Sequence, residues 1–278
     1  MLKSLWHVLP RRRAKSPSAL APPVEDATPG ARVVPSGVDR VRGRGAVVLE
    51  GVTKTIGLRP RQTEVLKGVD AIFPRGRAIG VLGEAGGGKS TLVQILTGNM
   101  APDAGRVIHG MRVSWPLGAR DIFRKDMTIR ANVRLLSLMY GAWAPDMLEA
   151  VKEIGKIRTQ DMDRPLAELV PDFTVRASTS LCYALDFDCY VADDQLCAGS
   201  RQFRDHIKTL ILERQKTHSL IIVSKNAAAI RDLCDDFYIL ENGIIKTYQN
   251  RREAYKVFTG VSLTARVDPR GEASDDAL

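Results

Sequence analysis

Two hydrophobic patterns alternate along residues 46–262. Residues 129–140 and 147–157 carry apolar side chains at the spacing of an amphipathic helix. Four short apolar runs are instead typical of buried strands, at 46–50, 78–82, 187–192 and 220–224. Because strands alternate with helices, the pattern predicts an α/β fold whose sheet is covered on both faces.

Turn-forming residues divide the remainder of this region. Residues 46–80 indicate short strands with turns, residues 102–105 indicate a turn, and strand-like residues follow between 106 and 115. Residues 236–248 predict a β-hairpin, because Asn242-Gly243 is a dipeptide that favours the tight turn between paired strands. No internal repeat is visible in the sequence.

The first 45 residues differ in composition from the rest. They are rich in proline, alanine, glycine and arginine without a sustained period, so we expect a disordered basic arm. Residues 1–46 hold nine lysines and arginines against three acidic residues, and therefore carry +6 of the net charge of +9. Since the positive charge is concentrated in the arm, no nucleic-acid partner is expected for the folded domain.

The first segment of this arm allows two interpretations. Its apolar side chains between Leu2 and Leu9, followed by Arg11-Arg12-Arg13, are weakly amphipathic and could touch an anionic membrane surface. A solvated tail is the favoured alternative, because one short turn with a few charges binds weakly. The order of charges after the apolar stretch does not fit a secretory signal. At the other end, residues 263–278 are expected to form a flexible tail.

Bulk composition narrows the class of protein. A chain of 278 residues can form one large domain or two small ones, and no apolar run approaches the roughly 18 residues that a membrane span needs. The four cysteines lack C-x-x-C spacing and a matching histidine cluster. They predict reduced structural thiols in a cytosolic protein and no metal site of their own.

The chemistry of the chain is indicated most clearly by residues 83–90, Gly-Glu-Ala-Gly-Gly-Gly-Lys-Ser. They fit G-x-x-x-x-G-K-[ST], the phosphate-binding P-loop, between a strand-like run and the start of a helix. Glycines let backbone N–H groups turn toward phosphates at a helix N-terminus. Lys89 would reach the terminal phosphates, and the Ser90 hydroxyl would bind Mg²⁺.

With these residues placed, residues 46–262 resemble the ATP-binding cassette family of transporter ATPases, and within it the subunits that energise export of capsular and related cell-surface polysaccharides. The resemblance implies a P-loop α/β core with an antiparallel β layer and a helical subdomain at about 125–182. The likeness rests on Gly51-Val52-Thr53-Lys54, the P-loop, 113–118 (Val-Ser-Trp-Pro-Leu-Gly), the helix followed by Tyr-Gly at 132–141, and 184–194, which include Asp-Phe-Asp-Cys-Tyr.

Several positions depart from the family pattern. Ile56 stands where an aromatic side chain stacks on adenine, Arg124 where a glutamine binds Mg²⁺, and Lys225 where a histidine orients water. The signature loop that a partner subunit contributes to the site is replaced by Val170-Pro171-Asp172-Phe173, and the family's loop aspartate by Ser200.

The catalytic carboxylates are also altered. The resemblance makes Asp193 the aspartate that supports Mg²⁺, but Asp194 follows it where the family has a glutamate base. A base about 1.5 Å short can cost about a hundredfold in rate. A signature without glycine cannot bring backbone donors close to the γ-phosphate. Lys225 and Arg124 can hold negative charge and would then form an ATP clamp, or can simply point into solvent.

The resemblance therefore implies an ATP-binding subunit of a polysaccharide-export-type transporter with weak or absent hydrolysis, on the cytoplasmic face of the inner membrane. Its expected partners are a membrane-spanning transporter subunit and either a second copy or another ATP-binding subunit. The alternatives are an ordinary transport ATPase with variant but working motifs and a nucleotide-sensing regulator without transport. The cofactors are ATP and Mg²⁺. The assigned residues are Gly83, Glu84, Ala85, Gly86, Gly87, Gly88, Lys89, Ser90, Thr91, Arg124, Asp193 and Lys225 for the nucleotide, Ser90 and Asp193 for Mg²⁺, and Asp194 as base.

Overall fold

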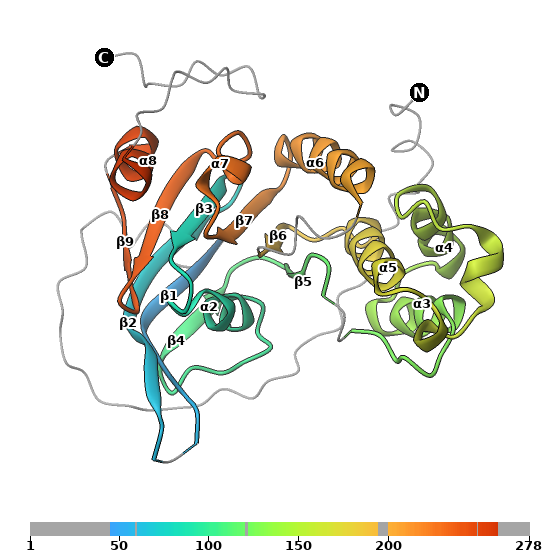
Figure 1. Ribbon diagram of the computed structural model, residues 1–278, viewed down its shortest axis with the longest axis horizontal. Helices are drawn as coiled ribbons and strands as arrows, with labels where there is room; N and C mark the ends of the chain where they lie inside the picture. The colour runs from blue at the N-terminus through green and yellow to red at the C-terminus, as the bar shows by residue number, and fades with distance from the viewer. Residues whose placement is uncertain (1–44, 59, 120–121, 194–199, 249, 261–278) are drawn as a thin grey trace. The chain divides into compact units, whose positions relative to one another are not determined.

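The computed structural model describes residues 45–58, 60–119, 122–193, 200–248 and 250–260 (Figure 1). The described residues form two compact units. The helical unit lies within Arg120–Asp186, and the sheet unit combines the described parts of Val41–Ala119 and Phe187–Leu278. The basic arm and the tail that the sequence predicts fall outside the described residues, apart from Gly45.

A three-stranded antiparallel sheet forms the first layer of the sheet unit. It consists of β1 (Ala46–Ile56), β2 (Thr63–Pro74) and β4 (Ala104–His109) in the order β2-β1-β4. Ala104 and Gly105, which the sequence assigns to a turn, belong to β4. After a register shift between Glu50 and Thr53 of β1, Ala104 pairs with Thr53. Gly105, at φ 79°, fits there because a Cβ atom would stand 2.4 Å from the carbonyl oxygens of both Glu50 and Gly51.

The second sheet has six strands and carries the P-loop. Its order is β5 (Val113–Pro116), β6 (Cys189–Ala192), β7 (Ser219–Ser224), β3 (Ala78–Gly83), β8 (Asp236–Glu241) and β9 (Ile244–Lys246). The strands from β5 to β8 are parallel, and β9 returns antiparallel to β8. All six residues of β3 are buried, as expected for a strand covered on both faces.

The hairpin of β8 and β9 confirms the turn predicted from sequence. Asn242 and Gly243 both take positive φ, at 52° and 80°, which is the backbone that the two-residue turn of a hairpin requires.

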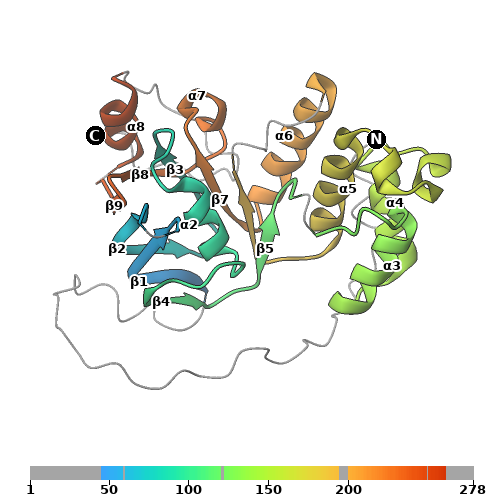
Figure 2. The same ribbon diagram turned by 60° about the horizontal axis from the view of Figure 1, so that its bottom comes forward.

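Helices pack on both sides of the parallel sheet. Figure 2 shows α2 (Lys89–Leu96) between the two sheets, with α7 (Ala227–Ile230) and α8 (Arg251–Thr259) on the other side. Leu92, Val93, Ile95 and Leu96 of α2 join one apolar core with residues of both sheets. α6 (Arg201–Gln215) completes the sheet unit, and its N-cap is Ser200, whose hydroxyl accepts from the Phe203 N–H at 3.3 Å.

The described residues of the helical unit form three α-helices, α3 (Ile129–Tyr140), α4 (Ala144–Glu153) and α5 (Pro171–Ala184), and two short 3-10 turns, η3 (Thr159–Asp163) and η4 (Leu166–Glu168). α3 has the predicted bounds, because Thr128 caps its first turn and Gly141, at φ 64°, ends it. α4 begins before residue 147 and ends before 157, since Pro145 suits a first turn and Lys156 takes positive φ. In the ranges that the structure describes, no helix combines the length and apolar character needed to cross a membrane.

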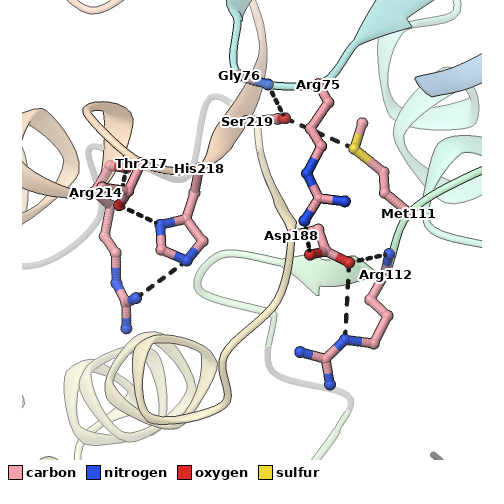
Figure 3. Close-up of polar contacts among 9 residues, drawn as sticks. All are labelled: Arg75, Gly76, Met111, Arg112, Asp188, Arg214, Thr217, His218 and Ser219. Atoms are coloured by element: carbon pink, nitrogen blue, oxygen red, sulfur yellow. Dashed lines mark hydrogen bonds and ion pairs between the residues drawn. The ribbon is translucent and has the colours of Figure 1, made fainter. Parts of the chain in front are cut away.

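The Trp115 and Asp188 segments, which carry the likeness to the export group, meet near the amino ends of the parallel strands. The rings of Trp115 and Phe187 lie edge to face at 5.5 Å. Asp188 accepts from the Arg112 N–H at 2.9 Å and pairs with the Arg75 guanidinium, while the Ser219 hydroxyl accepts from the Gly76 N–H at 2.8 Å (Figure 3). These contacts tie the strand starts together, at the edge opposite the P-loop.

Candidate nucleotide-binding site

The P-loop connects the end of β3 to the first residue of α2. Gly86 and Gly88 have φ angles of 78° and 88°, which strain a residue with a side chain. Gly88 is the N-cap of α2 and no side chain caps the helix. The N–H groups of the first helical turn have no partner within the helix, so the loop presents backbone donors to an anion.

The polar side chains of the loop have different surroundings. The Lys89 ammonium donates to the Glu84 carbonyl oxygen at 2.8 Å, and the Gly87 N–H donates to the same oxygen at 3.1 Å. Ser90 is exposed, whereas Thr91 is buried against the core. A phosphate group would therefore meet the Lys89 and Ser90 side chains at the surface of the loop.

Asp193 and Lys225 lie at the same sheet edge as the P-loop. Asp193 directly follows β6, and Lys225 directly follows β7. In the parallel ladder, Ser224 is opposite Leu82, and Ala192 is opposite Ile222. The carboxyl ends of neighbouring parallel strands meet at one edge, which is where α/β folds bind ligands.

Lys225 is an exposed residue in a tight connection from β7 to α7. The Asn226 N–H donates to the Ser224 hydroxyl at 3.0 Å, and the Asn226 side chain accepts from the Ala229 N–H at 3.1 Å. These two bonds fix the backbone on the C-terminal side of Lys225. Asp194, the predicted base, lies outside the described residues.

Arg124 belongs to the helical unit, whereas the P-loop, Asp193 and Lys225 belong to the sheet unit. The Asn132 side chain fixes the backbone of Arg124: it accepts from the Arg124 N–H at 2.8 Å and donates to the Arg124 carbonyl oxygen at 2.9 Å. The exposed guanidinium donates to both carboxylate oxygens of Asp126, at 2.9 and 3.3 Å. This hydrogen-bonded pair raises the pKa of Arg124 and lowers that of Asp126. An anion that recruits Arg124 would compete with Asp126.

Residues 170–173, at the signature position, form the N-terminus of α5. Val170 is the N-cap without a side-chain hydrogen bond, and Pro171 begins the helix. Asp172 lies in the first turn and pairs with Arg176 at 2.6 Å, and the Arg176 guanidinium lies 6.0 Å from the centre of the Phe173 ring. Proline removes one N–H donor, and the Asp172 carboxylate places negative charge beside the others.

The residues present fit a magnesium nucleotide. Mg²⁺ usually takes one or two protein oxygens and completes its shell with water and phosphate oxygens, which the exposed Ser90 hydroxyl and Asp193 would permit. Within the described ranges, no group of three or more His, Cys, Asp or Glu side chains could hold a metal ion, so a bound Mg²⁺ would depend on water and phosphate oxygens. Fold and site thus define a P-loop nucleotide-binding domain.

Comparison with known proteins identifies the family. The family model described as ABC transporter matches residues 66–165. The chain is 31% identical over 215 residues to the polysialic acid transport ATP-binding protein KpsT of Escherichia coli, covering 75% of this chain and 96% of KpsT. It is 29% identical over 194 residues to the ATP-binding protein BexA of Haemophilus influenzae, covering 70% of this chain and 89% of BexA. The chain belongs to the ATP-binding domain family of ABC transporters.

Solved structures agree on the fold. An ATP-binding subunit of an ABC transporter has a TM-score of 0.65 at 18% identity, covering 78% of this chain and 95% of that one. The cassette MJ0796, solved as a dimer bound to ADP and phosphate, has a TM-score of 0.64 at 18% identity, covering 74% and 99%. The predicted P-loop fold of the ABC type is confirmed.

Proposed function

We propose that this chain is an ATP-binding subunit of a polysaccharide-export-type ABC transporter that binds Mg-ATP through its P-loop and hydrolyses it weakly or not at all. The observation that carries the binding part is the P-loop itself, with positive φ at Gly86 and Gly88 and an uncapped α2 N-terminus. The polysaccharide class is inferred from relatives whose names include capsule polysaccharide export and polysialic acid transport.

Weak hydrolysis is supported by the chemistry of both halves of the expected composite site. On the P-loop side, the residue after Asp193 is an aspartate, and the exposed Lys225 has no acceptor atom with which to orient water. On the signature side, Pro171 and Asp172 begin α5. The Asp172 carboxylate, which also pairs with Arg176, interacts with the helix dipole itself and so competes with a γ-phosphate for this helix N-terminus. Even a competent partner subunit would leave neither composite site complete.

A membrane-spanning partner is supported by an apolar surface in the helical unit. Leu138, Met139 and Trp143, at the end of α3 and in the turn before α4, are 81%, 62% and 68% exposed. Exposed large apolar side chains that lie close together mark sites of protein or membrane interaction. We place the chain at the cytoplasmic face of the inner membrane, bound to a transporter subunit and dimerised with itself or with a second ATP-binding subunit.

Thermal unfolding with Mg-ATP and a paired lysine control tests the binding part. Saturating Mg-ATP should raise the melting temperature, because a ligand that binds only the native state stabilises it. Lys89→Ala should remove most of this gain. Lys152→Ala is the control, since Lys152 lies on the helical unit and pairs only weakly, at 3.4 Å, with Glu149. An absent shift in the wild type, or an equal shift in Lys89→Ala, would refute the proposed site.

A further inference from the structure

We propose that the Asn242-Gly243 turn between β8 and β9 positions the P-loop, with Gly243 acting through the backbone of β2. The inference rests on the proposed nucleotide site, because its consequence is the affinity for Mg-ATP. It adds a positioning residue that lies more than 150 positions after the P-loop in the sequence. Neither the family match nor the P-loop motif includes this turn.

The last glycine of the P-loop packs against β2. A Cβ atom on Gly88 would stand 2.7 Å from the Val65 carbonyl oxygen and 3.3 Å from a methyl carbon of Leu66. Because Gly88 is the N-cap of α2, its position sets where the N–H groups of the first helical turn point. The place of the Val65 carbonyl therefore limits the place of the phosphate-binding donors.

The hairpin turn packs against the same carbonyl. A Cβ atom on Gly243 would stand 2.9 Å from the Val65 carbonyl oxygen and 3.1 Å from Cγ of Lys67. The Lys67 N–H donates to the Gly243 carbonyl oxygen at 2.8 Å, so a hydrogen bond holds the turn to β2. One carbonyl of β2 is thus enclosed by the two glycines Gly88 and Gly243.

The first glycine of the P-loop is held by the strand that leads into this turn. Gly83 is the parallel partner of Leu240 in the ladder between β3 and β8. A Cβ atom on Gly83 would stand 2.9 Å from the Leu240 carbonyl oxygen. The first and last glycines of the P-loop therefore both contact backbone that the hairpin holds in place. Gly83 contacts Leu240 of β8, and Gly88 contacts Val65 of β2, to which the turn is hydrogen-bonded through Lys67.

A methyl group at Gly243 would disturb this arrangement in a measurable way. Ordinary contact begins near 3.4 Å, so the β2 backbone would have to move about 0.5 Å. A shifted loop would weaken at least one charge-assisted hydrogen bond from its N–H groups to the phosphates, which predicts about a tenfold weaker affinity for Mg-ATP. Loosening the contact between β2 and the P-loop should also make the loop open more often, which would appear as faster amide exchange in the P-loop even without nucleotide.

The test compares two variants at Gly243 with a matched control on the full chain. Gly243→Ala adds both the collision and the strain of positive φ, whereas Gly243→Asn keeps the collision with a residue that tolerates positive φ. Gly76→Ala is the control, because Gly76 has φ 75° but a Cβ atom there would meet nothing within 4 Å. Hydrogen–deuterium exchange of peptides over residues 83–92, the dissociation constant for Mg-ATP and the melting temperature are measured for each.

The inference predicts that both Gly243 variants speed exchange in residues 83–92 and weaken Mg-ATP binding about tenfold, while Gly76→Ala lowers only the melting temperature. Faster exchange confined to residues 236–246, or equal effects in Gly76→Ala, would overturn it. If Gly243→Ala fails to fold, Gly243→Asn decides. If the wild type does not bind Mg-ATP, the proposed function fails, and the exchange data alone then decide whether the turn positions the loop.

Discussion

Replacing Tyr238 by phenylalanine tests how much the hydrogen bond between β8 and β2 contributes to the stability of the fold. The Tyr238 hydroxyl donates to the Ile72 carbonyl oxygen at 2.8 Å, and its ring packs against Phe73 at 5.6 Å. Burial, aided by the neighbouring charge of Asp236, raises the pKa of Tyr238 from 10.0 to about 12. The folded protein therefore keeps this proton at pH values where the unfolded chain loses it.

The sign of the effect follows from this upward shift. The stabilisation is fully present below pH 10 and is lost as the pH rises from 10 toward 12, at about 1.4 kcal/mol per pH unit. Tyr238→Phe removes one hydrogen bond, which should lower the free energy of unfolding by about 1 kcal/mol at pH 8. The variant lacks the alkaline loss, so the two stabilities should converge near pH 11.

Urea unfolding of both proteins from pH 8 to pH 11 measures the difference directly. Other tyrosines titrate in both chains, so their contributions cancel in the difference between wild type and variant. We expect a gap of about 1 kcal/mol that closes as the pH rises. A gap that stays constant across this range would show that Tyr238 ionises equally in the folded and unfolded states, and would refute the reasoning.

Three further predictions concern the nucleotide and the arm. Ile56 is 41% exposed and pairs with Thr63, two residues before Val65, which packs against the P-loop. Ile56→Tyr should therefore strengthen ATP binding by about 1–3 kcal/mol through stacking on adenine. Unchanged affinity in titration calorimetry would show that adenine does not lie against residue 56. If Arg124 and Lys225 clamp ATP, Arg124→Gln and Lys225→His should each shrink the ratio of ADP to ATP dissociation constants from about tenfold, and a wild-type ratio near one would refute the clamp. A chain starting at Ala46 should keep its melting temperature and ATP response, and loss of cooperative unfolding would show that the arm is part of the folded structure.

Features with local signals could be predicted from the sequence. The P-loop, the α3 helix and the β8–β9 hairpin each depend on residues close together in the chain, such as Thr128 and Gly141 at the ends of α3. The α5 helix had no such signal, because its buried side includes Ser178, Thr179 and Ser180, which weaken the apolar pattern.

Long-range contacts of the site had no sequence signal of this kind. The role of Gly243 beside Val65 depends on strands that are distant in the chain and meet only in the fold. The Asn242-Gly243 dipeptide predicted the turn, but not its contact with Val65. Ser200, which the sequence places at the position of the family's loop aspartate, also caps α6, and this role is visible only in the structure.

The central claim is that the chain binds Mg-ATP but turns it over weakly or not at all. Its most direct test measures nucleotide binding and steady-state hydrolysis together on the purified full chain, alone and with the proposed membrane-spanning partner. We predict saturable binding that depends on Lys89, with turnover far below the ordinary enzyme range of about 1–10 per second. Turnover within that range would contradict the account and identify an ordinary transport ATPase.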